Sequence, residues 1–512
     1  MKRFTWSCAA LGIAWVLVGC GDDQHGTPCL HHDLSGVVSL GGETRLDLLF
    51  VIDDSSLVGS ALAQLPAQAA RMVRALSSGD RDGDGERDFG NIPSIRVGVV
   101  TTHLGSAGHA LATCDDGRFG ARLGDDGVLR EPADASACAA FPPLMALERG
   151  EDPADVIAQL SCAVAVGASG CGWEQPLESA LKALSPDAPT IWTAPGYVAP
   201  RFFDDTVGHA TGANAGLVRS GSALAVIVVT DEDDCSVADP EILDPASVRY
   251  GGATLATRCA VFPDALHAIE RYSASPSGLL SVRRNLVFAA IVGAPPDAVA
   301  LEGAPPDYDA VLAHPAMQIV IEDRDPPRVR PSCSTPDVGN ATPPRRIVET
   351  ARALEQLGAR TTVQSICQAD LSPAFDAVTR QIIEATAGFA PCIAAPERVE
   401  ECVLHELLPP ESAFHCADLP GRRAAGTQMH RGTLRERCEL MYIAPGGEGP
   451  GWTLERVAGA PAESLVADRC PRESAWIRFV GEPEPIDAAT LWLTCGIREG
   501  PDGGSCEDDA GT

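Results

Sequence analysis

The stretch that decides the fold runs from residue 45 to residue 52 and reads Arg45-Leu46-Asp47-Leu48-Leu49-Phe50-Val51-Ile52. It is a nearly continuous apolar run between polar residues, which is typical of a central parallel strand buried on both faces. Further candidate strands follow at 95–100, 223–229, 286–292 and 361–366, of which 223–229 and 286–292 are wholly apolar. Together these stretches predict the strands of one mostly parallel sheet.

Stretches with apolar residues at helical spacing separate the predicted strands. They lie at 57–76, 153–166, 174–184, 345–357 and 373–385. Because strand and helix alternate along the chain, we predict an α/β fold with a doubly wound, mostly parallel sheet. We place this domain, with insertions, at residues 42–390.

The pattern changes after Pro391. Short candidate strands at 440–443, 452–457, 476–480 and 491–494 lie between Gly/Pro turns, and cysteines recur among them. We therefore predict a small C-terminal disulfide-tied β-rich domain at 391–499. The acidic, Gly-rich tail at 500–512 is predicted to be disordered.

Charge excludes some partners. The 512 residues include 70 acidic and 39 basic side chains, a net charge of −31. Such a surface repels phosphate backbones, so we expect no nucleic-acid partner, and it attracts divalent cations. The two lysines, Lys2 and Lys182, do not follow a glycine, so no phosphate-binding GxxxxGK loop exists.

The N-terminus has the features of a secretion signal. Basic residues precede an apolar stretch at 4–18, which is shorter than the ~20 residues that span a bilayer. The stretch ends Leu17-Val18-Gly19-Cys20, which resembles the bacterial lipobox. The resemblance implies a lipoprotein signal peptide at 1–19, lipidation of Cys20, and membrane anchoring through several acyl chains. The alternative is an ordinary signal peptide with a chance cysteine.

We therefore expect a soluble body on a tether at 20–41, held at the cell envelope. The lipid anchor points to the bacterial outer membrane, with the body facing the periplasm or the exterior.

Cysteine counting agrees with export. Of 18 cysteines, Cys8 leaves with the signal and Cys20 takes lipid, and the remaining 16 suit eight disulfides outside the cytoplasm. No CxxC occurs among these 16, which disfavours zinc ribbons and thioredoxin-like chemistry. Local spacing predicts the pairs Cys114–Cys138, Cys162–Cys171, Cys235–Cys259 and Cys333–Cys367. Spacing does not decide how the other eight cysteines pair with one another: Cys29, Cys392, Cys402, Cys416, Cys438, Cys470, Cys495 and Cys506.

Acidic residues follow two of the predicted strands. The first strand continues into Asp53-Asp54-Ser55-Ser56-Leu57, and the strand at 223–229 continues into Thr230-Asp231-Glu232-Asp233-Asp234. Here the chain resembles von Willebrand factor A domains, and in particular exported bacterial lipoproteins that carry them. The resemblance covers residues 42–390. It implies a sheet order of 3-2-1-4-5-6 and a metal-ion-dependent adhesion site at the switch point between strands one and four.

The family's metal ligands map onto only some positions of this chain. Asp53 and Ser55 match the first two DxSxS positions, and Asp231 matches the strand-four aspartate. The third DxSxS position is Leu57, which has no oxygen to offer. The segment 170–175, our counterpart of the family's threonine loop, contains no threonine.

Carboxylates could replace the missing ligands. The candidates are Asp54, Glu174, Glu232 and Asp233. A site richer in carboxylate favours Ca²⁺ or Mn²⁺ over Mg²⁺ and repels an acidic ligand. The alternative is that Asp53 and Asp231 remain on a sheet that no longer binds metal.

The loop at 80–88 is a second candidate metal site. Its residues Asp80, Asp82, Asp84, Glu86 and Asp88 occupy the positions of a DxDxDG calcium loop, with Glu86 offering its carbonyl. Position 12 is Asn91 and not a bidentate glutamate, so we expect modest affinity. The alternative is a solvated acidic turn.

Signals for catalysis are poor. No GxSxG elbow occurs, and His405-Glu406 lacks the second histidine of HExxH. We expect a non-enzyme whose A-type domain binds an extracytoplasmic protein or glycan through a divalent cation. The alternatives are a structural envelope protein with a non-metal-binding fold and, third, a hydrolase.

Overall fold

A computed structural model gives the fold. Its described residues are 30–38, 45–55, 59–85, 88–89, 91–132, 141–148, 150–168, 170–299, 307–335, 339–386, 393–394, 402–409, 412–430, 433–444, 446–456, 474–480, 486 and 489–499.

The first part is built on a six-stranded sheet in the order β11-β6-β5-β2-β3-β4. Its strands are β2 (Arg45–Ile52), β3 (Ser94–Thr101), β4 (Met145–Leu147), β5 (Ala223–Val229), β6 (Leu286–Val292) and β11 (Arg360–Ser365). All neighbours are parallel except β4, which runs antiparallel at one edge. Numbered along the chain, this is the predicted 3-2-1-4-5-6 order, and the predicted fold class is confirmed.

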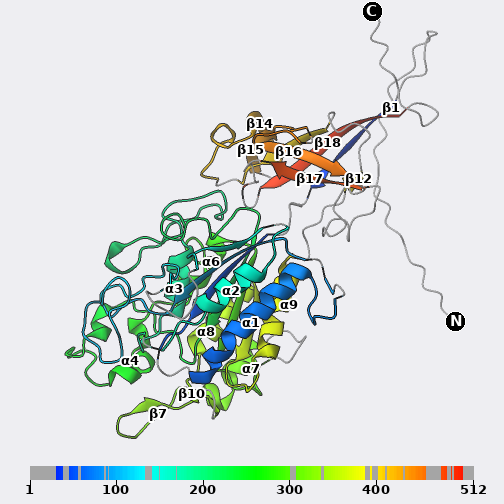
Figure 1. Cartoon of the computed structure of the whole chain (residues 1–512). Helices are drawn as coiled ribbons and strands as arrows, with labels where there is room; N and C mark the ends of the chain where they lie inside the picture. The colour runs from blue at the N-terminus through cyan, green and yellow to red at the C-terminus, as the bar shows by residue number, and fades with distance from the viewer. Residues whose placement is uncertain are drawn as a thin grey trace, which may run out of the picture. The chain divides into compact units, whose positions relative to one another are not determined.

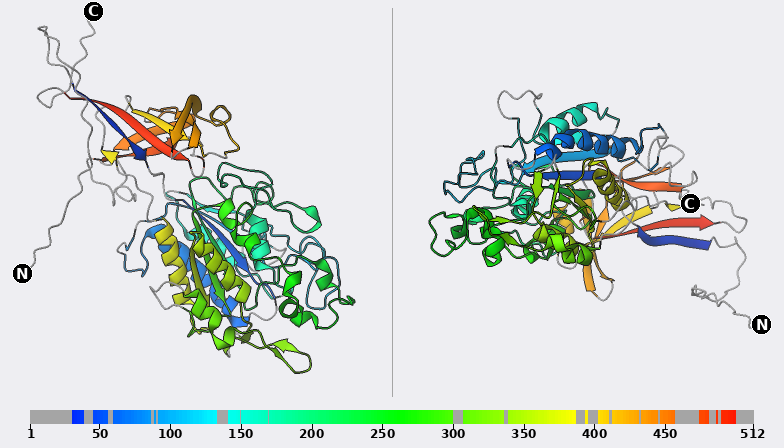
Figure 2. Two further views of the ribbon diagram at one scale, coloured as in Figure 1. Left: turned by 180° about the vertical axis from the view of Figure 1, so that it is seen from behind. Right: turned by 90° about the horizontal axis from the view of Figure 1, so that it is seen from below.

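Helices cover both faces of this sheet (Figure 1). One face carries α1 (Gly59–Ser78), α2 (Ala154–Ala163) and α9 (Ser372–Thr386), with α1 between the other two. The other face carries α3 (Pro176–Leu184), α5 (Glu270–Ser273), α6 (Leu279–Val282), α7 (Tyr308–Ala313) and α8 (Arg345–Gln356). Figure 2 shows the same layers from behind and from below.

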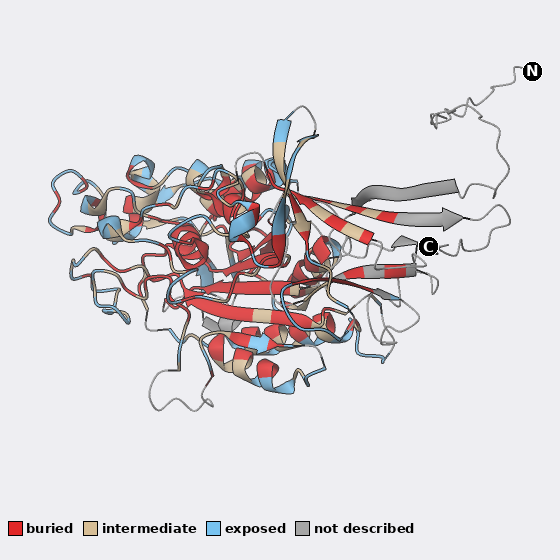
Figure 3. Cartoon of the chain, turned by 90° about the horizontal axis from the view of Figure 1, so that it is seen from above, coloured by how far each residue is buried: buried red, intermediate tan, exposed pale blue. Residues whose placement is uncertain are grey.

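Alternation along each strand divides the core in two. In β2, Leu48 and Phe50 pack with one helix layer, and Leu49 and Val51 pack with the other. Both sets are completely buried, as the red central strands in Figure 3 show. Burial on both faces explains why the sequence of β2 is almost wholly apolar.

The charged residue inside β2 is part of a buried ion pair. Asp47 lies 2.8 Å from Arg219 Nε and also accepts a hydrogen bond from the backbone N–H of Arg219. Paired in this way, a buried carboxylate is tolerated in the middle of a core strand.

Short elements fill the insertions. They are α4 (Leu255–Val261), the hairpin of β7 (Ile321–Glu322) with β8 (Arg328–Val329), and the hairpin of β9 (Cys333–Thr335) with β10 (Gly339–Ala341). The sequence did not predict α4, the two hairpins, α5, α6, α7 or β4. Each of these elements has too few residues to show a periodic pattern.

The C-terminal part is β-rich and contains two sheets. One has the order β1-β18-β13-β15-β14, formed by β1 (Leu30–Val38), β13 (Cys402–Leu407), β14 (Arg422–His430), β15 (Thr433–Leu440) and β18 (Thr490–Glu499). The other has the order β12-β17-β16, formed by β12 (Ile393–Ala394), β16 (Gly451–Arg456) and β17 (Ser474–Val480). Strand β1 falls within the stretch that the sequence assigned to the tether.

Disulfides correct part of the predicted pairing. Cys235–Cys259 and Cys333–Cys367 form as predicted. Cys114 pairs with Cys171 across 57 residues, so the predicted pairs Cys114–Cys138 and Cys162–Cys171 are wrong. The error came from matching nearest neighbours in the sequence, whereas the fold brings distant loops together.

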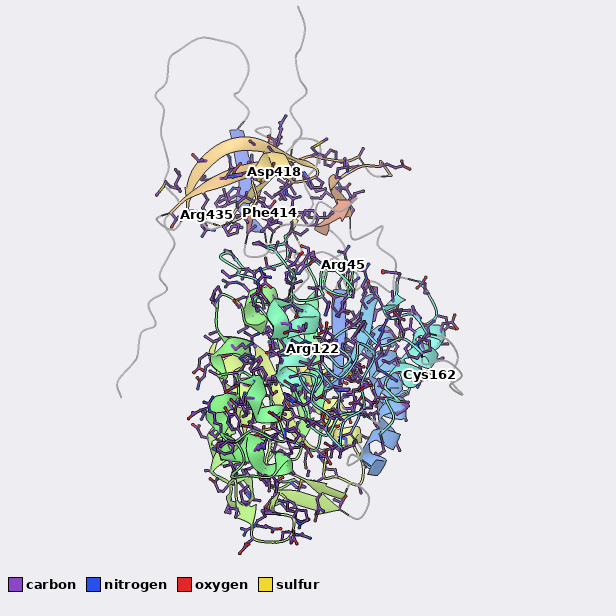
Figure 4. The ribbon with its side chains drawn as sticks, turned by 90° about the vertical axis from the view of Figure 1, so that its left-hand side faces the viewer. Arg45, Arg122, Cys162, Phe414, Asp418 and Arg435 are labelled. Atoms are coloured by element: carbon purple, nitrogen blue, oxygen red, sulfur yellow. A yellow bond between two sulfur atoms is a disulfide. The ribbon has the colours of Figure 1, made fainter. Side chains whose placement is uncertain are left out.

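The remaining cysteines that the structure describes are also disulfide-bonded. Cys162, labelled in Figure 4, is disulfide-bonded, and Cys138 lies outside the described residues. In the C-terminal part, Cys402 pairs with Cys495 and Cys416 pairs with Cys438. These bonds are typical of a protein outside the reducing cytoplasm.

Candidate metal centre

Two acidic strand ends meet at the centre of the sheet. Strands β2 and β5 are parallel neighbours, with Ile52 beside Val229. The backbone N–H of Asp53 donates to the carbonyl of Val229 at 3.0 Å. Asp53 and Asp231 therefore leave the same edge of the sheet, at the switch point where α/β folds place ligands.

The Asp53 carboxylate is fixed by two donors. Its Oδ1 accepts from the backbone N–H of Ser55 at 2.8 Å, and its Oδ2 accepts from Thr230 Oγ1 at 2.7 Å. The side chain is completely buried. The carboxylate is therefore held in one orientation at the end of β2.

Several buried oxygens beside Asp53 have no hydrogen-bond partner. They are Ser55 Oγ, both carboxyl oxygens of Asp231, and Glu174 Oε1. A buried polar atom without a partner costs about 1–3 kcal/mol, and folded proteins rarely leave several together. These oxygen atoms are of the kind that hard divalent cations take. Among the described residues, however, Asp53, Asp231, Glu174 and Glu232 do not bring three ligand atoms within 4.8 Å of one another, so side chains would have to move to close around an ion.

Burial, followed by neighbouring like charges, raises the pKa values of these carboxyl groups. Burial, followed by the charges of Asp53 and Glu232, raises the pKa of Asp231 to about 9. Burial and Asp53 raise the pKa of Glu232 to about 8. Burial, followed by Asp53 and Glu232, raises the pKa of Glu174 well above its usual range. A divalent cation would offset the like-charge part of all three shifts and stabilise the ionised carboxylates.

The four carboxylates proposed to replace the missing family ligands differ in where they lie. Glu174 is completely buried, and Thr102 Oγ1 donates a hydrogen bond to its Oε2. Glu174, Glu232 and Asp54 all act electrostatically on this site. Asp233 turns away, because its carboxylate accepts from the backbone N–H of Arg346 at the start of α8, at 3.0 and 3.2 Å.

Loops around the site are tied together. The Cys114–Cys171 bond joins the loop after β3 to the segment that carries Glu174. That segment is joined to the loop after β5, because the N–H of Cys235 donates to the carbonyl of Glu174 at 2.8 Å. Trp173 Nε1 also donates to the carbonyl of Cys235, at 2.9 Å. The loops that carry these carboxylates are thus joined by covalent and hydrogen-bonded cross-links.

The predicted calcium loop gathers only part of its ligand set. Carboxyl oxygens of Asp80, Asp82 and Asp88 lie within 4.8 Å of one another, and Asp84 is not in this group. Asp80 accepts from the backbone N–H groups of Gly83 and Gly85, at 2.6 and 2.9 Å. These backbone donors lower the pKa of Asp80.

Other sequence predictions lie outside the described residues. They are the lipidation site Cys20, the calcium-loop residue Glu86 and the DxSxS position Leu57.

His405 and Glu406 lie in β13, where the carboxylate of Glu406 accepts from Arg422 Nε at 2.6 Å inside the sheet. Among the helices that the structure describes, none is both long and apolar enough to cross a membrane.

Comparisons with known proteins found similarity only at the level of structure. No protein-family model matches the chain, and no curated protein matches it. Similar solved structures include a von Willebrand factor type A protein from Catenulispora acidiphila (TM-score 0.23, 9% identity, covering 93% of this chain and 66% of that chain). Others are human COPII-coat protein Sec24c (0.24, 8%, 91% and 46%) and the pilus adhesin SpaC from Lactobacillus rhamnosus GG (0.22, 8%, 91% and 41%).

The chain spans 66% or less of the length of these three matched chains. TM-scores this low carry no argument about function. The fold class therefore rests on the strand order and the helix layers, and the site on its own side chains.

Proposed function

We propose that this chain is a non-catalytic binding protein that holds a partner through a divalent cation at the Asp53–Ser55–Asp231 site. The observation that carries the proposal is the convergence of buried, unpartnered oxygens at one strand switch point. Three of the four atoms belong to Ser55 and Asp231, which the sequence had named as ligands. The hypothesis of a structural envelope protein without metal does not explain why these buried oxygens have no partners.

Asp53, Ser55 and Asp231 would hold the ion, with Glu174 and Glu232 completing a carboxylate-rich shell. Ca²⁺ and Mn²⁺ accept such irregular oxygen shells more readily than Mg²⁺, which demands near-ideal octahedral geometry. When bound, the cation supplies an open position for an oxygen atom of the partner.

The charge of the site limits the partner. Asp53, Glu174, Asp231 and Glu232 carry more negative charge when ionised than one divalent cation neutralises. An acidic ligand would therefore be repelled. The site favours a neutral oxygen donor, such as a glycan hydroxyl or a peptide carbonyl, on an extracytoplasmic protein or glycan.

We further propose that the protein acts at the cell envelope as a lipoprotein anchored through Cys20, as the lipobox-like sequence predicts. The five described disulfides support a place outside the cytoplasm. The Asp80–Asp88 loop would bind Ca²⁺ separately, with modest affinity.

Calorimetric titration with the metal alone tests the proposal. The whole chain carries Asp80→Asn and Asp82→Asn, so that the exposed loop does not contribute. We expect binding of Mn²⁺ and Ca²⁺ that weakens at least ~10–100-fold in Asp231→Asn. Asp233→Asn, on the same strand end but facing α8, is the matched control and should bind as the parent does. Absence of binding, or equal binding by Asp231→Asn, would leave the structural alternative in its place.

A further inference from the structure

We propose a second metal site, formed by Asp54, His103 and Asp125, that takes a transition-metal cation of the Zn²⁺ class. It goes beyond the proposed function, because it uses different ligands and a different ligand chemistry. One ring nitrogen of His103 and one carboxylate oxygen from each aspartate lie within 4.8 Å of one another.

The fold brings these residues together from two segments. Asp54 follows β2, and His103 follows β3, the parallel neighbour of β2. Asp125 lies further along the same loop, and its backbone N–H donates to the carbonyl of His103 at 2.9 Å. Its carboxylate accepts from Thr101 Oγ1 at 2.7 Å and from the backbone N–H of Arg118 at 2.9 Å. The third ligand is therefore positioned before any ion arrives.

Two of the three side chains are buried with unsatisfied atoms. His103 is 1% exposed and its Nε2 has no hydrogen-bond partner. Asp54 is 7% exposed and its Oδ1 also has none. Burying a neutral imidazole and a carboxyl without partners is costly unless a ligand completes them.

The other nitrogen of His103 also fits a metal ligand. Nδ1 lies 3.4 Å from Oδ1 of Asp115, which is half exposed. Ligating histidines usually direct their second nitrogen at a carboxylate, which fixes the ring. An imidazole that binds through Nε2 would leave Nδ1 facing Asp115 in this way.

Two glycines make room against the ligands. A Cβ on Gly170 would lie 2.1 Å from Asp54 Oδ1, and one on Gly124 would lie 2.7 Å from the His103 ring. The Cys114–Cys171 bond lies next in sequence to both Asp115 and Gly170 and holds their loops together. Arg130 interacts electrostatically with Asp54 and Asp125, and its guanidinium donates a hydrogen bond to the carbonyl of Ala163.

The mixture of imidazole and carboxylate identifies the class of cation. Mg²⁺ and Ca²⁺ prefer oxygen-only shells, whereas Zn²⁺ takes imidazole nitrogen at ~2.0–2.1 Å and carboxylate oxygen at ~2.0–2.2 Å. Three protein ligands leave a fourth tetrahedral position for water.

Zn²⁺ titration of the whole chain, again with Asp80→Asn and Asp82→Asn, tests the proposal. We expect His103→Gln to lower Zn²⁺ affinity at least tenfold while Mn²⁺ binding persists. His109→Gln, a partly exposed histidine 3.8 Å from Asp244, is the matched control and should bind Zn²⁺ as the parent does. Asp125→Asn is a second variant in case His103→Gln unfolds, and it should weaken Zn²⁺ binding too.

Asp231→Asn separates the two proposals, because it should lose Mn²⁺ and keep Zn²⁺. In crystals soaked in Zn²⁺, anomalous scattering should place the ion beside His103. Zn²⁺ binding that survives both His103→Gln and Asp125→Asn, or an ion found only beside Asp231, would overturn the second site and leave the first untouched.

Discussion

Replacing Asp231 with asparagine should stabilise the metal-free protein. Both Asp231 carboxyl oxygens are buried without hydrogen-bond partners, and the pKa is raised from 3.8 to about 9. At pH 7 the folded carboxyl therefore holds a proton that the unfolded chain has lost. Keeping that proton at pH 7, about three pH units above the unfolded pKa, costs roughly 1.4 kcal/mol of stability per unit. Part of this cost belongs to Asp53, because its carboxyl group interacts with that of Asp231. We expect roughly 2–4 kcal/mol of added stability in Asp231→Asn, because the amide carries no charge in either state.

Bound metal should offset much of that difference. A ligand present at ~100 times its dissociation constant stabilises the native state by about 2.7 kcal/mol. Wild type should gain this on addition of Mn²⁺, whereas Asp231→Asn, which binds ~10–100-fold more weakly, should gain at most about 1.4 kcal/mol at the same Mn²⁺ concentration. Chemical denaturation with chelator and with Mn²⁺ measures both effects.

Asp233→Ala is the control for this experiment. It removes a carboxylate that accepts from N–H groups at the start of α8, so it should lower stability by ~1 kcal/mol under both conditions and keep the response to metal. The reasoning is refuted if metal-free Asp231→Asn is less stable than wild type, or if its stability rises with Mn²⁺ as wild type does.

Three further predictions concern pH, the calcium loop and a disulfide. Because carboxyl pKa values at the strand switch point are raised to about 8 or 9, the metal-free folded state holds more protons than the unfolded state between pH ~4 and pH ~9. Its stability should fall as pH rises through this window, and metal affinity should rise; denaturation at a series of pH values would contradict this if metal-free stability increased instead. Asp80→Asn should weaken Ca²⁺ binding at the exposed loop at least tenfold and leave Mn²⁺ binding at the switch point unchanged, as calorimetry can measure; equal loss at both sites would mean that they are not independent. Replacing Cys114 and Cys171 together with alanine should lower stability by about 2–4 kcal/mol and weaken binding at the switch point; unchanged metal affinity would show that the bond does not brace the site.

Much of the fold was predictable because its signals are local. The apolar runs of β2 and β5 can be buried on both faces only in a central parallel sheet, and parallel strands end at the same edge. The meeting of Asp53 and Asp231 follows from those two facts. The polar, exposed strand β14 gives no such signal and was missed.

The rest of the site depends on long loops. Glu174 was a candidate from its sequence neighbourhood, but its burial depends on Thr102 and Cys235, which no pattern connects to it. His103 and Asp125 were missed for the same reason, since a loop of irregular conformation brings them together. The Cys114–Cys171 bond differs from the prediction that cysteines close in sequence pair with each other. Closing a longer loop adds only a small entropic cost, so short separation is a weak guide to pairing.

The central claim is that a divalent cation binds where β2 and β5 end. Anomalous scattering from a crystal soaked in Mn²⁺ tests it most directly, since it locates the ion and its ligands together. The account predicts a peak among Asp53, Ser55 and Asp231. Peaks elsewhere on the protein, with none at this strand edge, would contradict it.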